Sequence, residues 1–165
     1  TGTALMSPYL LPDAYVESLL HDDAPCGDAT TYALGIGGHA GQLIFRARQA
    51  MVLCGSEEAR RMGELRGLTM IGPMRDSGSR LQAGEVILRL KGDAASLHVV
   101  WKTAQTLMEY LSGIATSVAE IVAAAQRGNP QTSVVCTRKN FPGTKAAALK
   151  AVLSGGAAPH RLNLS

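Results

Sequence analysis

The chain has 165 residues, of which 46% are hydrophobic and 18% are charged. This apolar content suffices for one sizeable core and excludes a disordered protein. The formal net charge of +3 is small and its Lys and Arg residues are dispersed, which excludes the basic stripe of a nucleic-acid binder. Cys26, Cys54 and Cys136 are too far apart for a metal knuckle or an even disulfide framework, so a reducing cytoplasm is expected.

The beginning of the chain has no basic segment followed by an apolar signal core, and no apolar run reaches the roughly 20 residues needed to cross a bilayer. We therefore expect neither export nor a location in a membrane. We interpret residues 1–6 as a cloning remnant and assign no function to them.

Two helices are expected in the first part of the chain. Residues 12–21 form a short amphipathic pattern that begins at a proline. Residues 56–66 form a second helix, with Ser56 as the N-cap and with Glu57 and Glu58 in the first turn, where acidic side chains favour the helix dipole.

Strand patterns accompany these helices. Residues 41–55 form either one long bent strand or two short ones, and residues 68–71 and 85–90 form further strands. Together with the helices they predict a small α+β layer. Residues 83–92 (AGEVILRLKG) have a faint similarity to biotinyl or lipoyl carrier strands, but no Lys lies in a tight turn between Met-like neighbours, so that interpretation is discounted.

A long helix is expected over residues 96–126. Its apolar positions recur at spacings of three and four, as an amphipathic helix requires: Val100, Ala104, Leu107, Met108, Leu111 and Ile114. Gly113 costs about 1 kcal/mol relative to Ala within a helix, so it indicates close packing or a kink. Residues 128–130 end the helix.

The last part of the chain predicts a βα unit of the parallel-sheet kind. Residues 133–137 (SVVCT) form a short apolar run suited to a strand buried on both faces. Residues 142–144 open an Ala-rich helix that ends near residue 154, and two glycines follow. Residues 160–164 begin the next strand.

Two basic pairs stand at the ends of these strands. Arg138 and Lys139 follow the first strand directly, and His160 and Arg161 stand one βα unit later. Ligands of parallel α/β folds bind beyond the carboxyl ends of strands, and adjacent guanidinium and ammonium groups suit a multiply anionic ligand. The positive end of the helix that begins near Thr144 adds to this site. From the pattern alone, the alternatives are a solvated strand end and a structural histidine.

The amino-acid sequences of these segments resemble those of a known family. Residues 137–165 (TRKNFPGTKAAALKAVLSGGAAPHRLNLS) resemble the signature of the nicotinate-nucleotide pyrophosphorylases, also called quinolinate phosphoribosyltransferases. Residues 111–116 (LSGIAT) match a second block of that family, and residues 27–31 (GDATT) match a weaker third one.

The resemblance implies a fold and a reaction. The fold is α/β (α+β), with an N-terminal α/β sandwich domain and its connecting helix over residues 7–114 and the start of an incomplete α/β barrel over residues 115–165. The enzyme would be a cytoplasmic homodimer, or a higher oligomer, with sites completed across the interface. Phosphoribosyl pyrophosphate (PRPP), bound with Mg²⁺, would lose pyrophosphate to the nitrogen of an aromatic carboxylic acid.

The resemblance also assigns substrate-binding residues, namely Thr137, Arg138, Lys139, His160 and Arg161. Fixed positive charge would stabilise the departing pyrophosphate as the ribose becomes cation-like, and the carboxylates of the acid need cationic donors. The acidic residues that handle ribose and Mg²⁺ have no counterpart in residues 1–165, so no metal ligand is expected in this chain.

One position departs from the quinolinate-specific pattern. Where those enzymes have Glu-Arg, with the Arg reaching into the partner subunit's site, this chain has Trp101 and Lys102. A bidentate clamp is thereby replaced by a point charge, although Lys102 could also be a solvated lysine on a helix face. This difference, together with the sequences TRKNFPGTK and GGAAPHRL, makes the chain resemble more closely the ModD branch, pyrophosphorylases associated with molybdenum transport. It leaves the acceptor acid open.

Three functions remain as hypotheses: a ModD-type phosphoribosyltransferase, a quinolinate phosphoribosyltransferase of NAD biosynthesis, and a non-catalytic anion-binding module linked to molybdate transport. A complete barrel needs about 250 residues. Residues 1–165 alone are therefore expected to be inactive, with apolar faces and strand edges uncovered.

Overall fold

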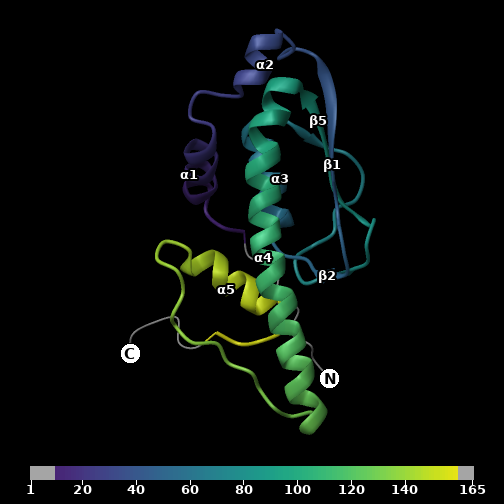
Figure 1. Cartoon of the computed structure of the whole chain (residues 1–165), viewed down its shortest axis with the longest axis vertical. Helices are drawn as coiled ribbons and strands as arrows, with labels where there is room; N and C mark the ends of the chain where they lie inside the picture. The colour runs from purple at the N-terminus through teal and green to yellow at the C-terminus, as the bar shows by residue number, and fades with distance from the viewer. Residues whose placement is uncertain (1–9, 160–165) are drawn as a thin grey trace.

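The computed structural model of the chain describes residues 10–159. In chain order its elements are α1 (Asp13–Asp23), α2 (Ala29–Leu34), β1 (Ala40–Arg46), β2 (Met51–Val52), α3 (Ser56–Leu65), β3 (Thr69–Met70), β4 (Arg80–Leu81), β5 (Val86–Asp93), α4 (Ala94–Gly128) and α5 (Lys145–Ser154). α4 is the long axis of the molecule, with the sheet beside one half of it and α5 crossing the other half (Figure 1).

Two small antiparallel sheets form the β layer. β5 is the central strand of the larger sheet, with β1 on one side and β3 on the other, and β2 pairs with β4. Exposure alternates along β1, where Phe45 is buried between the exposed Ile44 and Arg46. This period of two shows that one face of the strand lies on the core.

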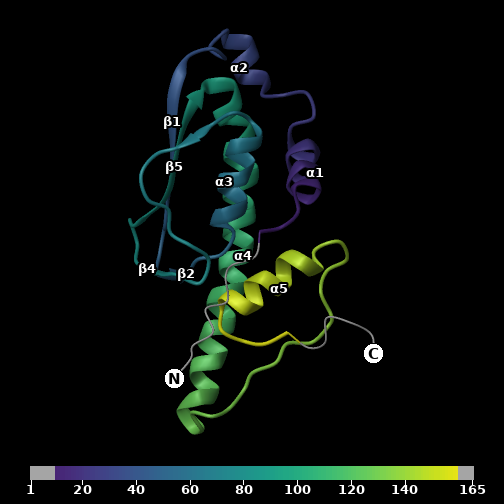
Figure 2. The same ribbon diagram turned by 180° about the vertical axis from the view of Figure 1, so that it is seen from behind.

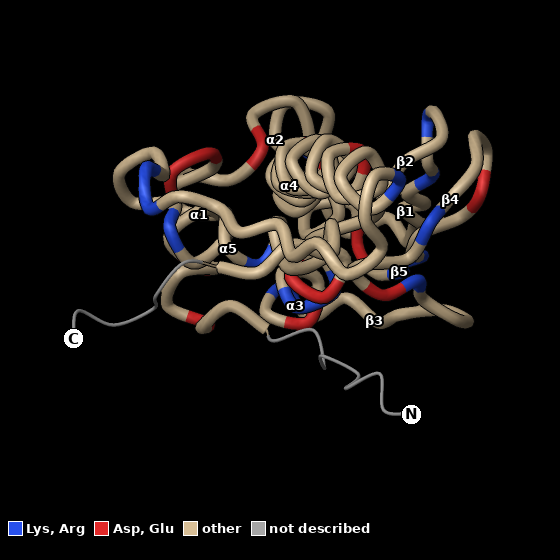
Figure 3. The backbone as a smooth tube through the Cα atoms, turned by 90° about the horizontal axis from the view of Figure 1, so that it is seen from below, with Lys and Arg blue, Asp and Glu red and all other residues tan. Residues whose placement is uncertain are grey.

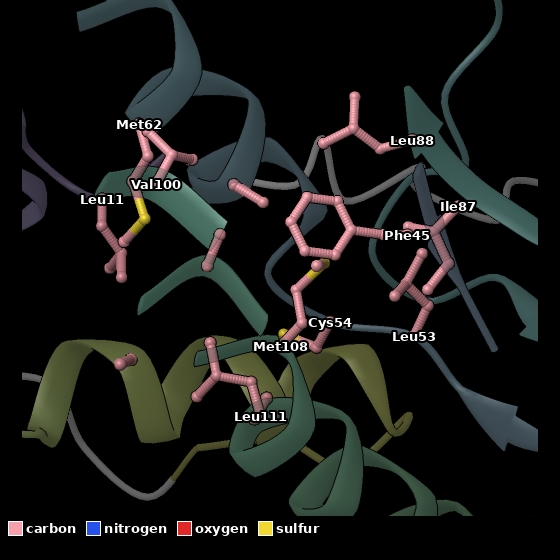
Figure 4. Packing of buried hydrophobic residues seen from close by; sticks show 14 of the residues in the cluster. Leu11, Phe45, Leu53, Cys54, Met62, Ile87, Leu88, Val100, Met108 and Leu111 are labelled. Carbon is pink, nitrogen blue, oxygen red and sulfur yellow. The ribbon is translucent and has the colours of Figure 1, made fainter. Parts of the chain in front are cut away.

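The helices α3 and α4 cover that face of the sheet and form the second layer. Phe45, Cys54 and Met108 meet in the middle of the core, with Leu88 and Leu111 beside them (Figure 4). A Cβ atom at Gly63 of α3 would lie 2.8 Å from Leu90 Cδ1 of β5. The absence of a side chain therefore lets α3 approach the central strand closely.

The helix α4 connects the sheet to the end of the chain. It has 35 residues and begins at the N-cap Asp93, whose carboxylate accepts a hydrogen bond from Ser96 N. Its length and its mean hydropathy of 1.3 over 18 residues would also suit a membrane span, although a core helix of a soluble protein meets the same test. One face of α4 packs on α3 and both sheets, and its second half packs on α5 (Figure 2).

The segment after α4 turns back along α5 toward the rest of the molecule. Val135 and Ala158 form a parallel bridge, in which Cys136 N donates to Ala158 O at 3.0 Å and Ala158 N donates to Val134 O at 2.9 Å. After α5 the chain therefore returns to pair in parallel with the segment before this helix, at a single bridge.

Most elements agree with the sequence analysis. The helices expected at residues 12–21, 56–66, 96–126 and 144–154 are confirmed, and residues 41–55 form two strands rather than one. The fold is mixed α/β, as expected. The short helix α2 was not anticipated.

Several details differ from the sequence analysis. Gly55, with φ of 96°, occupies the N-cap of α3, and Ser56 is its first helical residue. Gly113 has no atom within 4 Å of a virtual Cβ, so it does not mark close packing. The run 133–137 forms one bridge instead of a strand buried on both faces, and Val135 remains 53% exposed.

Candidate functional site

The first part of the candidate site is the segment that leads from the parallel bridge into α5. Thr137, Arg138 and Lys139 are all exposed, and the hydroxyl of Thr137 accepts a hydrogen bond from Lys139 N at 3.5 Å. Within residues 10–159, no acidic side chain forms an ion pair with Arg138 or Lys139. Lys and Arg positions lie where this loop enters α5, at the left edge of Figure 3. Their charge is therefore available to an anionic ligand.

The turn into α5 is built by residues whose backbone roles are clear. Gly143 has a φ of 82°, in the left-handed region that glycine adopts at little cost. The backbone N–H and the hydroxyl of Thr144 both donate to Phe141 O, at 3.1 and 2.8 Å. This compact turn places the N-terminal end of α5 next to the basic pair in the chain.

The second basic pair lies outside the described residues. The described residues end at Pro159, directly after Ala158, which forms the parallel bridge. His160 and Arg161 come next in the sequence, so their predicted role in binding stays a prediction.

Lys102 belongs to a separate surface on the first turns of α4. Its ammonium lies 4.3 Å from the centre of the Trp101 ring, which is a cation–π contact. The indole N–H of Trp101 donates to Gln105 Oε1 at 3.1 Å. Figures 1 and 2 show that this end of α4 is distant from the loop before α5. Within one chain, Lys102 and Arg138 therefore do not share a site.

The block GDATT has a structural role beside this surface. Asp28 is the N-cap of α2, and its Oδ1 accepts hydrogen bonds from Thr31 N at 2.7 Å and from the Thr31 hydroxyl at 2.6 Å. The Thr31 hydroxyl also lies 2.5 Å from His98 Nδ1, and the ring of His98 lies 6.5 Å from that of Trp101. The hydrogen bonds from Thr31, helped by His98, hold the pKa of the Asp28 carboxyl below its usual value.

An open cleft of about 710 Å³ borders the same network. Its walls come from the segment between α1 and α2 and from the first turns of α4, including Cys26, Asp28, Thr31 and Val99. Thr31 lines this cleft, and its partner His98 lies near the Trp101 ring. Sequence analysis missed His98, because a single His on a helix carries no signal of its own.

The block LSGIAT ties α4 to β2 and the turn after it. Ser112 Oγ accepts a hydrogen bond from Cys54 N at 3.0 Å and is buried, while Thr116 Oγ1 accepts one from Val52 N at 2.9 Å. Two small hydroxyl residues one turn apart thus satisfy one backbone donor of β2 and one of the turn after it. Part of what this block does is therefore structural.

A buried ionic cluster is the largest feature that sequence analysis missed. Lys150 of α5 contacts Glu57 and Glu58 of α3, across 93 and 92 residues of sequence. The only signal of this cluster in the sequence is a lysine within an Ala-rich helix. In the structure the nearby Ala147 and Ala151 are buried.

The described residues offer no metal centre. Within residues 10–159, no group of three or more His, Cys, Asp or Glu side chains could hold a metal ion. The functional groups of the candidate site are cationic, which suits phosphates and carboxylates and does not suit Mg²⁺.

The fold and these sites define the class of protein. Residues 28–112 match the N-terminal domain of quinolinate phosphoribosyl transferase, and residues 114–165 match its C-terminal domain. NadC from Streptococcus pyogenes superimposes with a TM-score of 0.85 at 29% identity, over 95% of this chain and 56% of that one. The chain belongs to the quinolinate phosphoribosyl transferase family.

Similar curated proteins are named as pyrophosphorylases. The chain is 44% identical to the "Putative pyrophosphorylase ModD" of Rhodobacter capsulatus, over 95% of this chain and 60% of that protein. It is 31% identical to a "Probable nicotinate-nucleotide pyrophosphorylase" of Synechocystis, over 96% of this chain and 53% of that protein. The chain thus spans between half and two thirds of the length of these relatives.

Proposed function

We propose that the protein is a phosphoribosyltransferase of the ModD type, which transfers phosphoribosyl from PRPP to an aromatic carboxylic acid and releases pyrophosphate. The observation that carries the proposal is the pair of cations Arg138 and Lys139, which are exposed just after the parallel bridge at Val135 and form no ion pair within residues 10–159. The resemblance of the whole chain to ModD proteins supports it.

The chemistry follows from charge. Pyrophosphate gains negative charge as its bond to the ribose carbon lengthens, so cations fixed around the leaving group stabilise the transition state more than the ground state. Thr137, Arg138 and Lys139 would bind the anionic groups of the substrates, together with His160 and Arg161. Mg²⁺ would neutralise the phosphates of bound PRPP, and its protein ligands are expected outside residues 10–159.

The acceptor acid would also meet Lys102. A lysine offers a mobile point charge where an arginine offers a planar fork that matches a carboxylate. The Trp101 ring limits where this ammonium can go, because Lys102 Nζ rests 4.3 Å above it. We propose that Lys102 contributes to the site of the partner subunit in a cytoplasmic homodimer, since the two surfaces are distant within one chain.

The proposal divides the chain within α4. Residues 7–114 would form the N-terminal sandwich with its connecting helix, and residues 115–165 would begin the barrel. The two family domains meet between residues 112 and 114, inside one continuous helix.

The test measures pyrophosphate release from PRPP and Mg²⁺ by the natural full-length protein, against a panel of aromatic carboxylic acids. We expect release with at least one acid and a loss of about 100-fold or more in Arg138→Met, because a charge-assisted, bidentate contact is removed. Arg127→Met, in the last turn of α4, is the matched control. Binding of PRPP without turnover across the panel would reject the enzyme and favour the anion-binding module linked to molybdate transport.

Quinolinate turnover for NAD biosynthesis is the second candidate, favoured by the family domains and by the NadC fold. It requires Lys102 to replace an arginine at the acid site. Quinolinate as the best acid of the panel, with release of CO₂, would select it over the ModD-type acceptor.

A further inference from the structure

Three ionisable side chains meet in the interior between α3 and α5. Lys150 Nζ lies 2.7 and 2.8 Å from the two carboxylate oxygens of Glu58 and 3.0 Å from Glu57 Oε2. The side chains of Lys150, Glu58 and Glu57 are only 2%, 0% and 9% exposed. Removing these charges from water costs free energy. Their mutual attraction offsets that cost only where the geometry of the ion pair is well defined.

The two carboxylates also accept hydrogen bonds from residues outside α5. Glu58 Oε1 also accepts a hydrogen bond from Leu11 N at 2.9 Å. Glu57 accepts from both the backbone N–H and the hydroxyl of Ser77, at 2.7 and 2.5 Å. Both carboxylates are therefore oriented by hydrogen bonds from residues outside α5, to which Lys150 adds the ammonium.

Apart from Lys150, the buried side chains of α5 are all apolar: Ala147, Leu149, Ala151 and Val152. At the end of α5, a Cβ on Gly155 would lie 2.5 Å from Ala115 O, so the helix is pressed closely to α4 there. Apolar contacts have no preferred direction, whereas the hydrogen bonds of a buried ion pair fail when the helix shifts by about 1 Å.

We infer that Lys150 is a positioning residue, which fixes α5 against Glu57 and Glu58 and thereby sets the place of the basic loop before it. The loop 138–144 leads directly into α5, so a shift of the helix displaces Arg138 and Lys139. Lys150 itself is buried, so its effect on a bound substrate would be indirect. This inference rests on the proposed function only for the identity of the anion that the loop binds.

The decisive variant removes the charges without leaving an unpaired one. In the triple variant Lys150→Met, Glu57→Gln and Glu58→Gln, the amide oxygens can still accept from Ser77 and Leu11. The single variant Lys150→Met leaves two buried carboxylates unpaired and is expected to unfold more easily. Lys91→Met, at an exposed lysine of β5, is the matched control.

Three quantities are measured on the natural full-length protein. Thermal unfolding reports stability, calorimetry with pyrophosphate and Mg²⁺ reports anion binding, and hydrogen exchange reports the loop 138–144 and α5. We expect the triple variant to remain folded, to bind pyrophosphate about tenfold or more weakly, and to exchange faster over the loop. Lys91→Met should match the wild type in all three.

Each other outcome is also decisive. A folded triple variant with wild-type affinity and wild-type exchange would overturn the inference. A triple variant that is unfolded at 25 °C would assign the cluster to folding and would overturn it equally. If the wild type binds no pyrophosphate, the proposed function fails, and loop exchange alone decides on the positioning role.

Discussion

Glu57 shows how a single buried carboxylate balances opposing effects. Burial alone would raise the pKa of its carboxyl, but the hydrogen bonds from Ser77 and the charge of Lys150 outweigh burial and hold the pKa below its usual value. A carboxyl with a lowered pKa in the folded state contributes stability above its unfolded pKa, about 4.3, and loses that contribution as the pH falls through the folded value.

Glu57→Gln should therefore destabilise the protein by about 1 to 3 kcal/mol at pH 7, since hydrogen bonds to an ionised group are lost. The difference from the wild type should shrink as the pH falls below about 4.3. Unfolding temperatures between pH 7 and pH 3 measure it, with the exposed Glu120→Gln as control. A difference that stays constant over this range would contradict the assignment.

The cation at position 102 gives a second prediction at this scale. Lys102→Arg should shift preference toward acids with two adjacent carboxylates, because a guanidinium can bind carboxylate oxygens with two hydrogen bonds. We expect the ratio of kcat/KM for pyridine-2,3-dicarboxylate to that for pyridine-3-carboxylate to rise by about tenfold. An unchanged ratio would mean that Lys102 does not contact the acid.

Among single residues, what the sequence could reveal depended on context. The sequence indicates Arg138 and Lys139 as candidates because they follow a β-branched run, and both are exposed and form no ion pair among the described residues. The partners of Lys150 could not be found, because Glu57 and Glu58 also fit the first turn of an exposed helix. Only the tertiary fold brings together residues 92 positions apart.

At the scale of elements, periodicity decided which predictions succeeded. α4 and α5 extend over enough turns for an apolar face to be visible in the sequence. α2 has six residues and β4 has two, which is too short for any period. Such short elements depend on tertiary contacts, as β4 depends on its pairing with β2.

The contact between α4 and the turn after β2 can be tested with a pair of serines on one helix. Ser112→Ala should destabilise by about 1 to 3 kcal/mol, because the buried N–H of Cys54 loses its acceptor. Ser117→Ala, at an exposed position, should change stability by less than about 0.5 kcal/mol. Urea unfolding of both variants measures the difference, and equal values would show that the Ser112 hydroxyl adds nothing.

At the scale of the whole molecule, the two basic surfaces belong to different ends of α4. Lys102 lies on the first turns, and the loop with Arg138 lies beside α5 (Figure 1). An isologous dimer can bring one surface of each subunit to the other surface of its partner, so that every site has both.

Mixing two inactive variants tests this arrangement. Lys102→Met and Arg138→Met proteins should each be nearly inactive as homodimers. In a mixed dimer one site carries both substitutions and the other carries neither, so random exchange of subunits should restore about a quarter of wild-type activity. Full-length proteins are denatured together and refolded, and pyrophosphate release is compared with that of each variant refolded alone. If both residues act within one subunit, mixing restores nothing, because no combination of these chains then contains an intact site.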